Sequence, residues 1–165
     1  MRRNKEFVVK AYRLAGMMIV IAAPAGAAEY LTNVTSEVFQ TAGSHDDIAR
    51  RGQACIAQKL HAVDGPVILN SDPASGTVTA RNSFEYGTLP RWKTRSTLTF
   101  EAKDGRFRMI HTNIEQFNDG ALGGPGWYGV GKWWGSTGKR VEKELTELSR
   151  AIAQCVTTAE KKDDW

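Results

Sequence analysis

Histidine and cysteine are scarce in this chain, which has three histidines and two cysteines among 165 residues. None of the histidines (His45, His61 and His111) has a second histidine or a cysteine at the spacing that metal ligands share. We therefore expect no metal site and no cofactor. His45 and His61 fall at the start and the end of a predicted helix, and His111 is read as a hydrogen-bonded core residue.

A recognisable catalytic grouping is also lacking. Ser44, His45 and Asp46 are the residue types of a hydrolase triad, but neighbours on one helical turn diverge and cannot form the relay. No pair of carboxylates stands out either. The sequence thus predicts no catalytic residues and does not support an enzyme, although catalytic groups gathered from distant positions stay an open alternative.

No apolar run is long enough to cross a membrane comfortably. The longest covers residues 14–23, whereas a spanning helix needs about 20 residues. Basic residues precede this run, and Pro24 and small residues follow it as far as Ala28. This order is typical of a secretory signal peptide, with a retained anchor as the alternative. We expect cleavage after Ala27 or Ala28, no stable membrane insertion afterwards, and a periplasmic or secreted protein.

The mature chain has no excess of either charge. The sequence has 22 Lys and Arg against 18 Asp and Glu, and residues 1–28 contain five of the former and one of the latter, which leaves 17 of each. The basic character therefore belongs to the export signal. A nucleic acid or anionic membrane surface is not predicted as a partner.

Both cysteines, Cys55 and Cys155, lie in the exported part. An even number of cysteines in an oxidising compartment favours a disulfide, and two separate buried thiols are the alternative.

Three strands are predicted near the middle of the chain. Residues 77–86 and 94–102 alternate apolar and polar side chains, which is the pattern of half-buried strands. Asp104-Gly105 then predicts a hairpin into residues 106–114, because both central residues of such a turn need positive φ.

The third of these strands contains a conflict. Phe107 and Met109 fall on one face, whereas Ile110, Thr112 and Ile114 fall on the other. Either a bulge near Met109 re-aims the strand or both of its faces are covered.

Two amphipathic helices flank this block. Ser44 can cap the first helix, and apolar or small residues recur along one stripe of it: Ile48, Gly52, Cys55, Ile56 and Leu60. The second begins at Lys139, with a stripe at Val141, Leu145, Leu148, Ile152, Cys155 and Val156. Because both cysteines lie on these stripes, we expect the helices side by side on one face of the sheet.

The remaining segments are two short strands and one long loop. Residues 35–40 and 67–69 are read as strands, and the glycine-rich residues 118–138 as a long loop. This loop contains the candidate binding residues Trp127, Tyr128, Trp133 and Trp134. Exposed, they can contact a protein, a glycan or a membrane interface; the alternative is that the rings fold back over an edge of the domain.

Two stretches resemble a known family. The turn and strand Ser-Asp-Pro-Ala-Ser-Gly-Thr-Val at 71–78 and the hairpin Phe-Glu-Ala-Lys-Asp-Gly-Arg-Phe-Arg at 100–108 are similar to motifs of an exported bacterial domain family of unknown function. That family has a TATA-binding-protein-like fold. The resemblance covers residues 44–117 and implies a curved antiparallel sheet with helices on one face. It implies no activity and no site residues.

Together these patterns predict an α+β fold of order β-α-β-β-β-β-α. Residues 1–28 form the signal peptide, 29–159 a single domain and 160–165 a charged tail. The leading hypothesis is a non-catalytic envelope protein that binds a protein or envelope component. The alternatives are an inhibitor or immunity protein for an exported toxin, and a small-ligand carrier or hydrolase whose site lies between sheet and loop.

Overall fold

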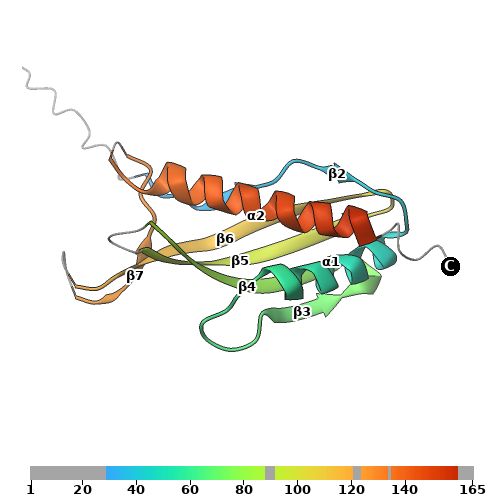
Figure 1. Ribbon diagram of the computed structural model, residues 1–165, viewed down its shortest axis with the longest axis horizontal. Coiled ribbons are helices and arrows are strands. Elements are labelled where there is room, and N and C mark those ends of the chain that lie inside the picture. Colours follow the sequence, from blue (N-terminus) through green and yellow to red (C-terminus); the bar gives the residue numbers. More distant parts are fainter. Residues whose placement is uncertain (1–28, 88–91, 121–123, 134, 160–165) are drawn as a thin grey trace, which may run out of the picture.

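The protein consists of two helices packed on one face of an open antiparallel sheet (Figure 1). The computed structural model describes residues 29–87, 92–120, 124–133 and 135–159. The predicted signal peptide and charged tail lie outside these residues. None of the described helices is long and apolar enough to cross a membrane.

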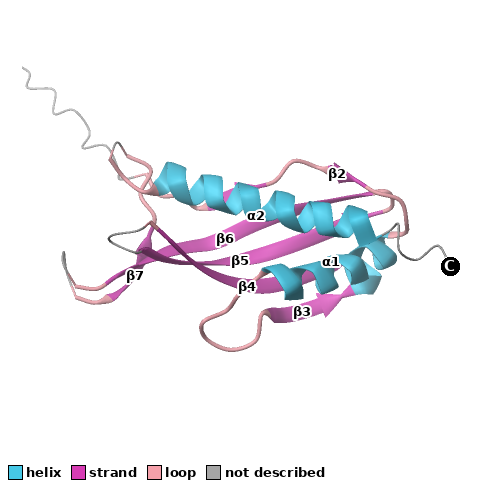
Figure 2. Ribbon diagram, in the orientation of Figure 1, coloured by secondary structure: helices cyan, strands magenta, loops and turns pink. Residues whose placement is uncertain are grey.

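The elements follow one another along the chain as Figure 2 shows. They are β1 (Asn33–Thr35), β2 (Phe39–Gln40), α1 (His45–Lys59), β3 (Ile68–Asp72), the 3₁₀ turn η1 (Pro73–Ser75), β4 (Thr77–Tyr86), β5 (Trp92–Lys103), β6 (Arg106–Asn118), β7 (Gly126–Gly129) and α2 (Gly138–Ala159). The sheet order is β1-β6-β5-β4-β3, and β2 and β7 also pair with β6. The predicted α+β architecture is confirmed.

The core lies between the sheet and the two helices. Alternate residues of β4, β5 and β6 face the helices and are buried: Val78, Ala80, Leu98, Phe100, Ala102, Phe107 and Met109. The hairpin between β5 and β6 forms at Asp104-Gly105 as predicted, although Gly105, at φ +75°, is the turn residue with positive φ and Asp104 is not.

A bulge in β6 explains why the apolar face of this strand switches along residues 106–114. Thr97 pairs with Thr112 and Arg95 with Glu115. One residue of β5 therefore lies opposite two residues of β6 between these pairs. Asn113 takes up the extra residue at φ +50°. A bulge is thus present, four residues later than the position near Met109. It turns Ile114 into the core beneath α2, where its side chain is 4% exposed.

The helices follow the predicted stripes. The Ser44 hydroxyl accepts a hydrogen bond from the Asp47 backbone N–H and so caps α1. Gly52 lies against the ring of Phe100, close enough that a Cβ atom at this position would be 2.7 Å from the ring. A disulfide joins Cys55 to Cys155 across the two helices, as predicted.

Two expectations were wrong. Residues 35–40 do not form one strand, because Thr35 pairs with Ile110 and Phe39 with Phe107, so the regular pairing with β6 is interrupted between β1 and β2. At Ser36 the chain is still bonded to β6, and the Ser36 hydroxyl accepts a hydrogen bond of 2.9 Å from the Met109 backbone N–H. Residues 118–138 are not a continuous loop, because β7 lies within them and pairs with the end of β6. The observed order therefore has one strand more before α1 and one more before α2.

Candidate functional site

Trp127 lies on β7, at the end of the sheet away from α1 (Figure 1). The register of β7 with β6 places Trp127 directly opposite Phe117. The two ring centroids are 5.4 Å apart in an edge-on arrangement. Aromatic pairs of this geometry are favourable beyond the area they bury, so Phe117 fixes one side of the indole.

Arg95 on β5 holds the Trp127 ring from another direction. Its guanidinium carbon is 4.4 Å from the centroid of the indole ring. The Nε of Arg95 also donates a hydrogen bond of 2.7 Å to the Glu115 carboxylate. The carboxylate orients the cation over the ring, where the negative face of the indole attracts it. Trp127 is therefore held by contacts from both β5 and β6.

A pocket of about 560 Å³ opens beside this ring, and we call it the Trp127 pocket. Its apolar walls are formed by four side chains from separate parts of the chain: Val63, Phe84, Phe117 and Trp127. Glu85 and Lys93 also line it, and the two residues are cross-strand partners on β4 and β5. An apolar pocket of this size with a few polar groups is the usual form of a ligand site.

The segment between α1 and β3 forms one wall of the Trp127 pocket. It is fixed to the edge of β4, because the backbone N–H of Ser83 donates to the carbonyl of His61 at 2.7 Å. The Arg81 guanidinium donates to the carbonyl of Asp64 in the same segment. These bonds hold Val63 beside the pocket although its side chain is 75% exposed.

The four predicted binding residues are not gathered at one place. Trp127 is half-buried in the pocket, whereas Tyr128 follows it in the strand, is 49% exposed and donates its hydroxyl hydrogen bond to the Gly124 carbonyl. Trp133 is 53% exposed and lies edge-on against Tyr30. Trp134 lies outside the described residues. Of the four, only Trp127 contributes to the pocket among the residues that can be placed.

The three histidines lie in different surroundings, and the buried Nδ1 of His111 has no hydrogen-bond partner among the described residues. His45 contacts Asp104 at 2.9 Å, and this hydrogen bond raises the pKa of the imidazole. His111 is fully buried with its Nε2 3.0 Å from the Ser149 hydroxyl, and burial lowers its pKa to about 4. His61 lines the Trp127 pocket. Across the described ranges, no three His, Cys, Asp or Glu residues are placed to hold a metal ion.

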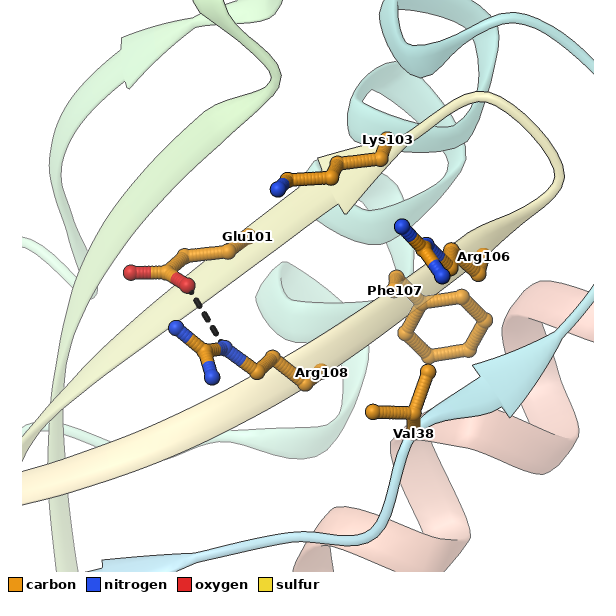
Figure 3. A pocket seen from close by; sticks show the side chains of 6 residues that line it. All are labelled: Val38, Glu101, Lys103, Arg106, Phe107 and Arg108. Atoms are coloured by element: carbon orange, nitrogen blue, oxygen red, sulfur yellow. Dashed lines mark hydrogen bonds and ion pairs between the residues drawn. The ribbon is translucent and has the colours of Figure 1, made fainter.

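A smaller pocket of about 210 Å³ lies at the β5–β6 hairpin (Figure 3). Val38 and Phe107 form its apolar side, and Lys103 and Arg106 extend from the two strands on either side of the hairpin turn. The Arg108 guanidinium points to the Glu101 carboxylate, with 2.7 Å between Nε and Oε2. Its cations are exposed, so water competes for them, and it offers less apolar surface than the Trp127 pocket.

Sequence reasoning missed most of the Trp127 pocket. Arg95 and Phe117 contact Trp127, and Glu115 contacts Arg95, because the bulge at Asn113 shifts the end of β6 by one residue. Alternation alone does not reveal such a shift. The alternation in residues 77–86 predicted the strand that contains Phe84, although not the position of this side chain beside a pocket.

No protein-family model and no curated protein sequence matches the chain. Solved structures do. A DUF4468 family protein from Bacteroides ovatus ATCC 8483 matches with a TM-score of 0.51 at 15% identity, over 82% of this chain and 90% of that one. A TBP-like protein from Parabacteroides distasonis ATCC 8503 matches with a TM-score of 0.49 at 11% identity, over 79% and 85%. The first likeness confirms the fold that the sequence resemblance implied, and at this identity it establishes the fold alone.

Proposed function

We propose that this protein is exported and binds a protein or envelope component without catalysis, with the Trp127 pocket as its binding site. The observation that carries the proposal is the fixed indole of Trp127 beside a pocket of about 560 Å³. An aromatic ring that is already ordered loses little conformational freedom on binding, so it makes an efficient contact. The ligand group that fits is apolar and flat, with a polar substituent for Glu85 or Lys93.

The compartment is supported by two features. Residues 1–28 have the composition of a signal peptide. The disulfide between Cys55 and Cys155 is of the kind that persists in oxidising environments.

The test is affinity capture from an envelope fraction with three proteins: the wild type, Trp127→Ala and Trp133→Ala. Trp133 is the matched control, because it is a half-exposed tryptophan that does not line the pocket. We expect Trp127→Ala to lose the partner and Trp133→Ala to retain it. Equal recovery of every partner by all three proteins would contradict the proposal.

A small-ligand carrier is a second candidate, supported by the volume of the pocket and by its place between sheet and loop. Native mass spectrometry of the protein isolated from its own compartment separates the two. A carrier is expected to retain a small molecule that Trp127→Ala has lost, whereas a protein-binding domain retains none.

A further inference from the structure

The buried apolar residues form two clusters rather than one. The larger cluster lies beneath both helices and includes Met109 of β6 and Ile152 of α2. The smaller cluster lies beneath the first half of α2 and includes Ile114 of β6 and Leu145 of α2. The disulfide between the two helices belongs to the larger cluster. The same strand and the same helix therefore contribute to both clusters, at different points along their length.

Buried polar side chains lie between the two clusters, and we call them the polar belt. They are all the buried polar residues that the structure describes: Asn82, Thr94, Ser96, His111 and Ser149. On β6, His111 follows Met109 of the larger cluster and precedes Ile114 of the smaller one. On α2, Ser149 lies between Leu145 and Ile152 in the same way. The polar belt thus interrupts the apolar contact between the sheet and α2 at one level of the core.

His111 is the member of the polar belt that can acquire a charge. Its Nε2 lies 3.0 Å from the Ser149 hydroxyl, whereas its Nδ1 has no hydrogen-bond partner within the described ranges. A protonated imidazole carries an N–H donor on both nitrogens, so the Nδ1–H would be buried without an acceptor. Protonation is therefore unfavourable as long as α2 covers this side chain.

No charged neighbour offsets a proton on His111. The strand pairing places Leu98 of β5 and Val34 of β1 opposite it, and α2 contributes Ser149. None of the buried residues described is an Asp, Glu, Lys or Arg. The charged residues of β4, β5 and β6 occupy the alternate positions that face away from the helices, and those of α2 are exposed or half-exposed. Burial lowers the pKa of His111 to about 4, and it raises the pKa of Tyr86 in the smaller cluster above its usual 10, so Tyr86 stays neutral in acid.

The two halves of α2 are held in different ways. The second half is joined to α1 through the disulfide at Cys155. The buried residues of the first half are Gly138, Val141 and Leu145, and the latter two pack in the smaller cluster. Moving the first half away from the sheet brings water to His111 without breaking the disulfide or the larger cluster. It is therefore the smallest rearrangement that exposes the imidazole, and such local openings need less free energy than complete unfolding.

We propose that acid separates the core at the polar belt. When His111 takes up a proton, the first half of α2 and the smaller cluster open, while the larger cluster and the disulfide keep the rest of the domain folded. The opening also reaches the Trp127 pocket, because Ile114 of the smaller cluster and Phe117 of the pocket belong to the same strand, β6. The inference does not rest on the proposed function, since it holds whether or not the pocket binds a partner.

Hydrogen exchange of the disulfide-bonded mature protein, followed by mass spectrometry at pH 7 and pH 4, tests the proposal after correction for the intrinsic pH dependence of exchange. The opening should become about a hundredfold more populated at pH 4, because the pKa of His111 is about 4 when buried and 6.5 when exposed. Protection of residues 138–148 should fall by about this factor, to a level well below that of α1 and residues 150–159. Equal protection of the two halves of α2 at pH 4 would overturn the proposal, because the core would then open as one unit.

Variants separate His111 from the other groups that titrate in acid. His111→Gln cannot take up a proton, so the loss of protection in residues 138–148 should be about tenfold smaller than in the wild type or less. His111→Leu with Ser149→Ala makes this part of the belt apolar and should be equally insensitive, which covers the case in which glutamine disturbs the packing. His45→Gln removes a histidine outside the belt and should respond like the wild type. An acid response as large in both His111 variants as in the wild type would also overturn the proposal.

Discussion

At the end of the sheet that α1 covers, the helix-facing side chains are apolar and closely packed, and a disulfide ties the two helices together. At the end that carries β7, a second and smaller apolar cluster packs beneath α2, and the sheet there has two pockets, an exposed loop beside β4, and buried polar atoms without hydrogen-bond partners among the described residues. Figure 1 shows these two ends on opposite sides of the molecule. We call them the stapled end and the open end.

The difference between the ends indicates how stability and binding are divided. The larger of the two buried apolar clusters lies at the stapled end together with the disulfide, so we expect this end to supply more of the free energy of unfolding. The open end contains features that cost stability, such as the buried Asn82 Nδ2, which has no hydrogen-bond partner among the described residues. Changes at the stapled end should therefore alter stability first, and changes at the open end should alter binding first.

The largest expected effect comes from the disulfide. It closes a loop across a sequence separation of 100 residues, and removing such a link costs up to about 4.7 kcal/mol in the chain-entropy model. Cys55→Ala with Cys155→Ala should lower the free energy of unfolding by several kcal/mol in a urea titration. A loss below about 1 kcal/mol would show that the stapled end does not dominate stability.

His111 lies between the two ends, and its effect depends on pH. Burial lowers the pKa of His111 from 6.5 to about 4. Between these two pH values the imidazole is protonated in the unfolded chain but stays neutral in the folded protein. The free energy of unfolding is therefore unaffected by His111 above pH 6.5. It falls by about 3 kcal/mol as the pH is lowered from 6.5 to about 4.

Urea unfolding between pH 7 and pH 4 tests this linkage. His111→Gln cannot titrate, so its stability should fall less steeply with acid than that of the wild type. Parallel curves for the two proteins would show that His111 does not carry this dependence.

Gly52 tests the packing of the stapled end. A Cβ atom here would lie 2.7 Å from the buried ring of Phe100, and such overpacking costs about 1–3 kcal/mol. The better helix propensity of alanine offsets about 1 kcal/mol of this. Gly52→Ala should therefore be less stable than the wild type by up to about 2 kcal/mol. Gln58→Ala, on the exposed side of the same helix, is the control; equal stability of both variants would mean that α1 and the sheet separate freely.

The smallest expected effect is that of His45, an exposed residue bonded to Asp104 at the β5–β6 hairpin. This bond raises the pKa of His45, so its contribution is fully present below pH 6.5 and is lost as the pH rises through the raised value. An NMR titration of His45 should give a higher pKa in the wild type than in Asp104→Asn. A value unaffected by the substitution would exclude this contact in solution.

The stapled end was predictable from the sequence because local periodicity determines it. The stripes that contain Cys55 and Cys155 and the alternation around Phe100 each follow from spacing alone. Most of the open end was not predictable, because the bulge at Asn113 and the pairing of β7 depend on tertiary contacts rather than on any repeating pattern.

One signal at the open end was present in the sequence. Asn82 has the same parity as Val78 and Ala80, which face the core, so alternation places a polar residue among buried ones. A polar residue at a core position is a warning of either a hydrogen-bonded network or a site. Only the structure shows that Asn82 belongs to the polar belt between the two apolar clusters.

The most direct test of the division between stability at the stapled end and binding at the open end compares Trp127→Ala with the double cysteine variant. Two quantities are measured for each variant: partner capture from the envelope and the free energy of unfolding. Trp127→Ala loses contacts with Arg95 and Phe117 worth about 1–2 kcal/mol and should lose the partner. The cysteine variant should lose several kcal/mol yet keep the partner under conditions where it is folded. Retention of the partner by Trp127→Ala, or its loss by the folded cysteine variant, would contradict the assignment of binding to the open end.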